Sequence, residues 1–308
     1  MLHNPTPLRV IASEAAGVES DGVRFAVVGR WSKELQRYRD ELFDSWTGRR
    51  SMLPDDCSTS GVMEQTTTLT AGRMLLDCSE GGTVLDLASG RRRVLSEPVV
   101  GAGLTSTGID WISIGRRWAH GFGTCTDSDG ANRFCDAYVD FLNGATRVFR
   151  YDTNAPAPGG YRDLDAPGLP WRSLCRRTGP IIDEYHRVHV PPYWVGGRGL
   201  RRCRDGTLVR DVHRWGIPSD FVDGTLALAA GVGGNGRAGV YDLARDRVLS
   251  WQLPQVGRRR RPDTTVAHTR CAVYFAATLR RTDDLYVAST RVFRADMPSP
   301  HDPRCEAR

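Results

Sequence analysis

Short segments with alternating or fully apolar positions recur along the chain, and each runs into a turn residue and then into a second strand-like segment. In the four clearest copies an Asp lies four residues before the turn residue. These copies are Leu42-Phe-Asp-Ser-Trp-Thr-Gly48, Val84-Leu-Asp-Leu-Ala-Ser-Gly90, Val139-Asp-Phe-Leu-Asn-Gly144 and Val240-Tyr-Asp-Leu-Ala-Arg-Asp246. A strand, a tight turn and a returning strand form a β-hairpin, so the repeat predicts an all-β chain.

Two weaker copies, Arg202-Cys-Arg-Asp-Gly206 and Leu285-Tyr-Val-Ala-Ser-Thr-Arg291, extend the series. The turn positions 48, 90, 144, 206, 246 and 290 then follow one another at intervals of 40 to 62 residues. Such a period is typical of repeat units built from one four-stranded sheet. We therefore predict about six such sheets, with five or seven as the alternatives, separated by longer loops at 151–170 and 186–199.

Apolar segments upstream of the turns supply further strands. We expect inner strands at Val23–Val28, Gly72–Leu76, Gly224–Ala229 and Cys271–Ala276, and an innermost strand beginning near each of Asp110-Trp111 and Asp220-Phe221. Helical periodicity is scarce. The best candidate is Ser32–Phe43, where Leu35, Tyr38 and Leu42 would share one face, and it predicts a loop helix or an irregular strand connection.

The phrases Val84-Leu-Asp-Leu-Ala-Ser-Gly90 and Val240-Tyr-Asp-Leu-Ala244 resemble the third strand and hairpin of blades in the β-propeller superfamily, loosely those of WD-type and TolB-like repeats. The resemblance covers about residues 20–297 and indicates no specific family, because the Gly-His and Trp-Asp pairs of WD repeats are absent. It implies one propeller domain over residues 1–308 with flanks at both ends. It also implies a ring of sheets whose loop faces bind partners.

The eight cysteines indicate disulfides, because none forms a C-x-x-C pair or lies at zinc-binding spacing from a histidine. Of 105 possible connectivities, pairing in chain order would join Cys57 with Cys78, Cys125 with Cys135, Cys175 with Cys203, and Cys271 with Cys305. Disulfides persist in oxidising compartments, which favours a secreted or cell-surface protein. The N-terminal Met-Leu-His-Asn-Pro-Thr-Pro shows no basic region followed by an apolar stretch, so either a signal peptide has been removed or the chain is cytosolic with eight free thiols.

The distribution of charge and the motifs in the sequence indicate which classes of partner and cofactor to expect. The net charge of +6 comes from dispersed arginines. Arg91–Arg93 lie in a predicted hairpin turn and Arg258–Arg261 in a predicted loop between strands, so we expect no nucleic-acid partner. No apolar run is long enough to span a membrane. The segment Gly231–Gly236 lies between predicted strands, and no phosphate-binding or dinucleotide motif is present, so we expect no cofactor. We expect a monomer.

A polar segment between Cys125 and Cys135 contains Asp127, Asp129 and Asn132. Its oxygens could bind calcium, but an EF-type loop needs a distal Glu and further regular ligands. The other interpretation is a polar hairpin turn closed by a disulfide.

Ligand-binding candidates are histidines, tryptophans and carboxylates near predicted loops and innermost strands. The candidates are Asp110, Trp111, His120, Glu184, His186, His189, Trp194, His213, Trp215 and Asp220. No catalytic motif is present, so we favour a non-enzymatic propeller that binds a protein or glycan ligand through its loops. The alternative is a secreted carbohydrate-active hydrolase or lyase with a carboxylate pair in a central cleft. A purely structural domain is a third possibility.

Overall fold

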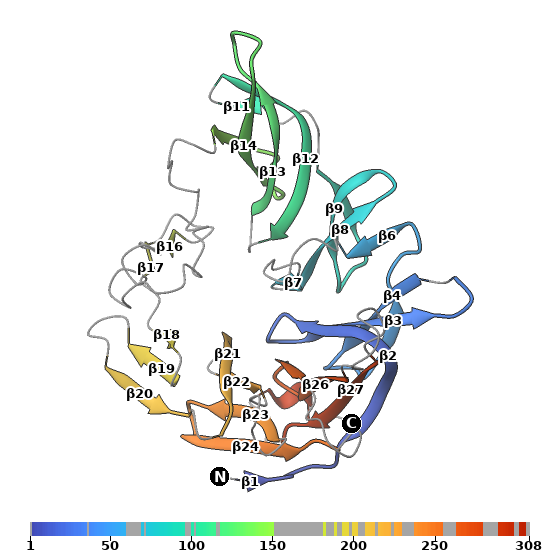
Figure 1. The fold of residues 1–308 in the computed structure, drawn as a ribbon, viewed down its shortest axis with the longest axis vertical. Coiled ribbons are helices and arrows are strands. Elements are labelled where there is room, and N and C mark those ends of the chain that lie inside the picture. The colour runs from blue at the N-terminus through green and yellow to red at the C-terminus, as the bar shows by residue number, and fades with distance from the viewer. Residues whose placement is uncertain are drawn as a thin grey trace. The chain divides into compact units, whose positions relative to one another are not determined.

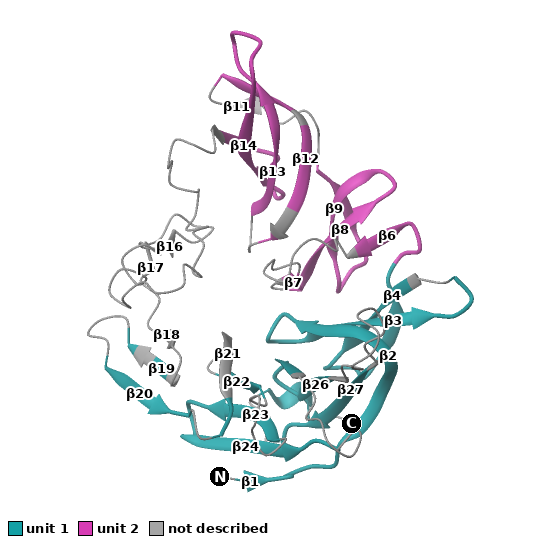
Figure 2. Ribbon diagram, in the orientation of Figure 1, with its two compact units in different colours: residues 1–53, 192–308 teal, residues 54–191 magenta. Residues whose placement is uncertain are grey.

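A computed structural model shows an all-β chain, as the repeat predicts (Figure 1). The structure describes residues 2–35, 37–59, 69–70, 72–95, 100–101, 103–114, 118–150, 181–182, 188–189, 193–196, 199–202, 207–212, 215–222, 225–229, 237–254, 263–279, 289–298 and 302–305. The chain divides into two compact units (Figure 2). Unit 1 comprises residues 1–53 and 192–308, and unit 2 comprises residues 54–191.

Unit 2 contains two five-stranded antiparallel sheets and one short strand pair. The first sheet comprises β6 (Cys57–Thr59), β7 (Leu69–Thr70), β8 (Arg73–Cys78), β9 (Gly81–Asp86) and β10 (Arg92–Val94). The second comprises β11 (Val100–Gly101), β12 (Leu104–Ile114), β13 (Trp118–Thr126), β14 (Asn132–Asp140) and β15 (Thr146–Arg150). The short pair is β16 (Ile181–Ile182) with β17 (Val188–His189).

The described residues of unit 1 form three sheets. One comprises β18 (Tyr193–Gly196), β19 (Gly199–Arg202) and β20 (Leu208–Asp211). The next comprises β21 (Ile217–Val222), β22 (Thr225–Ala229), β23 (Arg237–Asp242), β24 (Arg247–Gln252) and the added strand β1 (Leu2–His3). The third runs β25 (Asp263–His268), β26 (Ala272–Leu279), β27 (Ser289–Asp296), β2 (Arg9–Ser20), β3 (Phe25–Ser32), β4 (Arg37–Asp44) and β5 (Arg50–Met52).

The seven-stranded sheet is two four-stranded sheets joined through β2. The first part of β2 pairs with β27, from Arg9 to Ala15, and the second part pairs with β3, from Ala15 to Ser20. Register shifts interrupt both pairings, and Glu14 has a left-handed φ of 57°. One bulged strand therefore ends the last sheet and begins the first.

Consecutive sheets within each unit pack face to face. In β26, Phe275 belongs to a core cluster with Trp251 of β24, whereas Tyr274 points to the other face and packs with Phe43 of β4. The β21–β24 sheet is also buried on both faces, because its other face packs on Leu200 of β19. A succession of up-and-down sheets that stack face to face is the β-propeller architecture. The number of blades stays a prediction.

The repeated Asp organises each hairpin turn. Its carboxylate accepts hydrogen bonds from backbone N–H groups inside the turn: Trp46 N–H donates to Asp44, Ser89 N–H to Asp86, Leu142 N–H to Asp140 and Arg245 N–H to Asp242. The turn residue has positive φ in each of the four clearest copies, 71° at Gly48, 72° at Gly90, 80° at Gly144 and 43° at Asp246. The repeat thus specifies a turn geometry, and the carboxylates of the repeated Asp residues stabilise the turns.

Three local interpretations of the sequence are wrong or incomplete. Residues 32–43 form no helix, because β3 pairs with β4 along its length and Trp31 packs edge-on against Tyr38 across the hairpin. The last turn position, Thr290, lies inside β27. The segment 186–199 contains the short strands β17 and β18, whereas 151–170 and Gly231–Gly236 lie outside the described residues.

Three of the four predicted disulfides are confirmed. They join Cys57 with Cys78, Cys125 with Cys135, and Cys271 with Cys305. The pairing of Cys175 with Cys203 falls on residues outside the described ranges. Each confirmed bond joins cysteines that follow one another along the chain.

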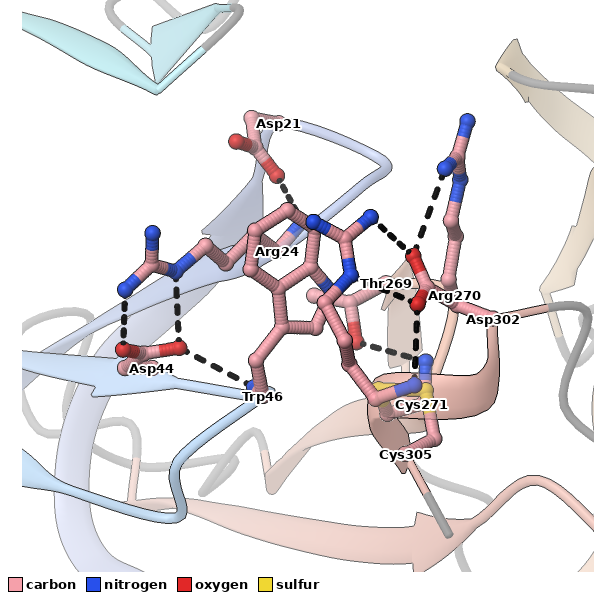
Figure 3. A network of polar contacts seen from close by, with 10 residues as sticks. Asp21, Arg24, Asp44, Trp46, Thr269, Arg270, Cys271, Asp302 and Cys305 are labelled. Atoms are coloured by element: carbon pink, nitrogen blue, oxygen red, sulfur yellow. Dashed lines mark hydrogen bonds and ion pairs between the residues drawn. A yellow bond between two sulfur atoms is a disulfide. The ribbon is translucent and has the colours of Figure 1, made fainter. Parts of the chain in front are cut away.

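The bond between Cys271 and Cys305 belongs to a network that holds the C-terminal segment on unit 1 (Figure 3). Arg304 makes a bidentate ion pair with Asp302 at 2.6 and 2.7 Å, and Arg270 reaches the same carboxylate at 3.4 Å. Arg304 also lies over the ring of Trp46, 3.4 Å from its centroid. We call residues 24, 44, 46, 270, 302 and 304, together with this disulfide, the C-terminal clasp.

Arg24, in the turn between β2 and β3, completes the clasp by binding Asp44 at the end of β4 and Trp46 in the turn that follows. Its guanidinium lies 4.7 Å from the Trp46 ring centroid and pairs with Asp44 at 2.6 and 3.0 Å. Burial alone would raise the pKa of Asp44, but hydrogen bonds from Arg24, Thr47 and Trp46 lower it to about 2. The two hydrogen bonds from Arg304 likewise hold the pKa of Asp302 well below its usual range.

In the described part of the chain, no helix has the length and apolar character that crossing a bilayer requires.

Candidate functional site

Alternation along β13 and β14 separates two kinds of side chain. On one face lie aromatic and polar residues, namely Trp118, His120, Phe122, Thr124, Phe134, Asp136 and Tyr138. On the other lie Ala119, Gly121, Gly123, Cys125, Cys135, Ala137 and Val139. Successive side chains of a strand point to opposite faces of a sheet, so the small residues form one surface and the aromatic residues the other.

The face with small residues is packed into the core of unit 2. A Cβ atom on Gly121 would lie 2.3 Å from Cγ2 of Ile109, and one on Gly82 of β9 would lie 2.0 Å from Cδ1 of Trp111. Trp111 is 7% exposed and fills the space between these strands as part of the core cluster. This tight packing fixes which face of the β12–β15 sheet is turned toward unit 2's core.

The opposite face carries a polar pair beside an aromatic ring. Nε2 of His120 lies 2.9 Å from Oδ1 of Asp136. The imidazole stacks on the ring of Tyr138, which lies directly across the strand pair, with centroids 4.6 Å apart and planes 20° apart. Tyr138 is only 4% exposed, so the stack holds the His120–Asp136 pair in one orientation.

Farther along the same face, two phenylalanine rings stack. The centroids of Phe122 and Phe134 are 5.6 Å apart and their planes differ by 12°. Phe134 is 65% exposed, the highest value among the large apolar side chains that the structure describes. Such an exposed aromatic is unusual on a packed sheet and typical of an interaction surface.

Asp110 joins this face from β12. It pairs directly with Phe122, which in turn pairs with Asp136 on β14. Neighbouring strands are about 4.8 Å apart, so the backbones at the two carboxylates lie roughly 10 Å apart on either side of Phe122. We call residues 110, 120, 122, 134, 136 and 138 the aromatic face.

The hairpin that ends β13 is stiffened on two levels. The disulfide between Cys125 and Cys135 joins its two strands, and Asp127 organises the loop. Oδ1 of Asp127 accepts hydrogen bonds from the N–H groups of Ala131 at 2.9 Å and Asp129 at 3.1 Å. The Ala131 N–H bond, with Arg133 as a further partner, lowers the pKa of Asp127. The rigid loop therefore presents Phe134 with little conformational freedom.

The calcium candidates lie in this loop. Oδ1 of Asp127 is directed to the backbone, its Oδ2 lies 3.4 Å from Arg133, and Oδ1 of Asn132 accepts from Thr126. No group of three or more His, Cys, Asp or Glu side chains within the described ranges could hold a metal ion. The arrangement present is that of a disulfide-closed hairpin turn.

Of the other predicted ligand residues, the structure describes the side chains of Trp111 and Trp215, and neither is a member of the aromatic face. Trp111 pairs with Gly121 on the inward face of the sheet and is buried in the core of unit 2, so it is not part of the aromatic face. Trp215 belongs to unit 1, where it packs beside a core cluster with Arg210 lying 5.5 Å from its ring centroid. The backbones of His189, Trp194 and Asp220 lie in β17, β18 and β21, but their side chains, and Glu184, His186 and His213 altogether, fall outside what the structure describes.

Four members of the aromatic face were missed by the sequence analysis: Phe122, Phe134, Asp136 and Tyr138. A signal was present, because Trp118-Ala-His-Gly-Phe-Gly-Thr-Cys125 and Phe134-Cys-Asp-Ala-Tyr-Val139 alternate large or polar residues with small ones. That alternation is typical of a strand whose small residues pack closely against a neighbouring sheet and whose large or polar residues lie on the opposite face.

Comparison with known proteins supplies no family. No protein-family model matches the sequence. No curated protein matches it either.

Among solved structures, the chain is similar to the AfRom2 CNH domain at 7% identity and a TM-score of 0.23, with 93% of this chain and 64% of that domain covered. It is similar to the β-propeller domain of the Trilobed protease from Pyrococcus furiosus at 10% and 0.27, covering 87% and 80%. The catalytic domain of the Coprinopsis cinerea GH62 α-L-arabinofuranosidase gives 9% and 0.25, covering 93% and 92%. Likenesses this remote carry no argument about function. The chain's own succession of stacked up-and-down sheets places it in the β-propeller superfamily, without a specific family.

Proposed function

We propose that the chain is a non-enzymatic propeller that binds a protein partner through the aromatic face. The observation that carries the proposal is the stacked pair of Phe122 and Phe134, with Phe134 65% exposed at the end of a disulfide-closed hairpin. Aromatic anchors on rigid elements dominate binding energies, because little conformational entropy is lost when they are covered. Asp110 and the His120–Asp136 pair would supply a polar surround.

The proposal includes an oxidising environment and a monomeric chain. Three disulfides support a secreted or cell-surface location, where such bonds persist. The hairpin's own bond makes the presentation of Phe134 depend on that environment.

Photocrosslinking at the proposed anchor tests the function. A photoreactive phenylalanine analogue is placed at 134 and, as the matched control, at Leu142, which is 54% exposed on the turn after β14 of the same sheet. Both chains are irradiated in the extracellular fraction of the producing organism. We expect one partner to be crosslinked from 134 and not from 142.

Affinity for that purified partner then decides the matter. Phe134→Ser is expected to weaken binding about 30-fold, the effect of losing an anchor of about 2 kcal/mol, while Leu142→Ser leaves it unchanged. Equal crosslinking from both positions, no specific crosslink from 134, or an unchanged affinity of Phe134→Ser would refute the proposal.

The carbohydrate-active enzyme is a second candidate because two carboxylates share the aromatic face. Asp110 and Asp136 flank Phe122, and Asp136 contacts His120, so an acid, a base and an apolar platform for a sugar ring are close together. A polysaccharide panel assayed for released reducing or unsaturated ends tests this reading. If the chain is such an enzyme, the native chain should turn over one of the polysaccharides. Asp136→Asn should abolish this activity and Phe134→Ser should reduce it.

A further inference from the structure

A second surface, in unit 1, is already occupied by the chain itself. Residues 2–6, which we call the N-terminal arm, lie along the outer edge of β24, where Leu2 pairs with Leu249 and His3 with Ser250 in parallel register. The Asn4 N–H then donates to the Ser250 carbonyl oxygen at 2.7 Å. The other strand pairs that the structure describes are antiparallel, as befits consecutive strands of a blade. The arm is therefore an addition to a complete four-stranded sheet.

β24 meets the arm with polar groups placed for an extended chain. Oγ of Ser250 lies 2.8 Å from Nδ1 of His3, and the Gln252 N–H donates to Oδ1 of Asn4 at 2.7 Å. Nε1 of Trp251 donates to the backbone carbonyl of Thr6 at 3.0 Å. The Trp251 side chain is fully buried, so its Nε1 depends on an acceptor at the edge of the sheet. This edge is built to be covered by a segment of main chain.

The arm is held by these polar contacts and by little burial. Leu2 is 44% exposed, His3 and Asn4 are exposed, and no arm residue belongs to the hydrophobic clusters that the structure describes. Edge pairing of this kind can be exchanged for an equivalent strand, because the same main-chain hydrogen bonds are available to either.

The conformation of Asn4 adds a side-chain requirement. Its φ of 46° lies in the left-handed region, which Asn and Gly adopt more readily than other residues. An Asn there turns its amide oxygen onto the Gln252 N–H, so it both ends the pairing and caps the next donor of β24.

We propose that the outer edge of β24 is a peptide-binding site that the N-terminal arm occupies in cis. Its ligand is an extended segment of a partner protein, running parallel to β24, with an Asn that ends the paired stretch and a carbonyl two residues later for Trp251. The arm acts as a competitor for this site, and the site is independent of the aromatic face.

The test weakens the arm and supplies its sequence in trans. Asn4→Gly removes the amide acceptor while it tolerates the left-handed conformation; Asn143→Gly, in the exposed turn after β14, is the matched control. The probe is a fluorescein-labelled peptide of residues 2–9, Leu-His-Asn-Pro-Thr-Pro-Leu-Arg, followed by anisotropy. We expect the Asn4→Gly chain to bind it about tenfold more tightly than the native chain or Asn143→Gly, because a lost hydrogen bond weakens the competitor by about that factor.

A peptide with Pro in place of Asn lacks the N–H that donates to Ser250, and it is expected not to bind. Peptide added to the native chain at saturation should also speed hydrogen exchange at the Asn4 amide, a readout that needs no variant. The proposal would be overturned if all three chains bound the peptide with equal affinity or if the Pro peptide bound. It would also be overturned if the peptide left the hydrogen-exchange rate of the Asn4 amide unchanged. An arm-exchanged dimer that the peptide does not dissociate would overturn it too, because the occupant would then be a second copy of the chain.

Discussion

The disulfide-closed hairpin of unit 2 and the C-terminal clasp of unit 1 contain the same kinds of interaction, but these have different structural consequences. Each combines a disulfide with a buried Asp whose oxygens bind nearby arginine and backbone donors, Asp127 in one and Asp302 in the other. In the hairpin the parts are local and leave Phe134 exposed. In the clasp they are distant in sequence and two guanidinium groups cover Trp46. Local closure presents a surface, whereas long-range closure ties down a chain end.

Removing the two disulfides gives the largest expected contrast. The bond from Cys271 to Cys305 spans 34 residues and that from Cys125 to Cys135 spans 10. Chain-entropy reasoning then gives about 4 kcal/mol for the first and about 3 kcal/mol for the second. Urea unfolding of the two double Cys→Ala variants measures both losses. A hairpin bond that contributes as much as the clasp bond would contradict the distinction between local and long-range closure.

The aromatic centre of the clasp comes next in size. Trp46→Leu removes two cation–π contacts, each worth roughly 0.5–1 kcal/mol at a partly exposed site, so the free energy of unfolding should fall by about 1–2 kcal/mol. Trp31→Leu is the control, because Trp31 packs on Tyr38 and no guanidinium among the described residues lies over its ring, so its loss should be smaller. Equal losses would mean that the arginines over Trp46 contribute nothing.

Acid should loosen the clasp. The pKa of Asp44 is about 2 in the folded chain, below its ordinary value, so its contribution is complete above about pH 4 and is lost as the pH falls through 2. Solvent screening reduces this contribution to about 1 kcal/mol. The lowered pKa of Asp302 adds a loss of the same sign.

Asp44→Asn keeps an oxygen acceptor for the turn but cannot titrate. Unfolding experiments at pH 4 and pH 2 should therefore show a smaller drop in stability for Asp44→Asn than for the native chain. Parallel pH profiles for the two chains would show that the ion pair with Arg24 does not stabilise the clasp.

The smallest expected effect on stability is at the aromatic face. Phe134 is 65% exposed, so Phe134→Ser should change the free energy of unfolding by no more than about 0.5 kcal/mol. Thermal or urea unfolding checks this value. A loss above about 2 kcal/mol would show that Phe134 is a packing residue and not a presented anchor.

Local chemistry explains what the sequence could predict. The Asp and Gly of each repeat specify one turn without help from distant residues, as at Asp86 and Gly90, and the hairpin between Cys125 and Cys135 closes over ten residues. Of the two alternatives for residues 32–43, a loop helix or an irregular strand connection, the helix did not form because strand pairing between β3 and β4 outweighed a local periodicity. Turn chemistry is encoded nearby, whereas pairing partners are not.

Predicting the aromatic face requires knowing how the sheet packs against its neighbour, and the sequence of a single strand does not contain that information. The alternation along β13 separates His120 and Phe122 from Gly121, but only the packing of Trp111 against Gly82 and Gly121 identifies the inner face. Asp110 and Trp111 are neighbours in sequence and lie on opposite faces, so they cannot line the same surface of the sheet. The parallel pairing of β1 with β24 joins segments that are far apart in the sequence and has no local signal.

Measuring stability and partner binding together in Phe134→Ser and Trp46→Leu tests the central claim most directly. The partner is the protein crosslinked from position 134, and its affinity is measured by calorimetry alongside urea unfolding of each chain. Phe134→Ser should lose about 30-fold in affinity with its unfolding free energy intact, while Trp46→Leu should lose stability and keep its affinity. The reverse pattern, or a loss of both properties in both variants, would contradict the division between a surface that binds and a clasp that stabilises.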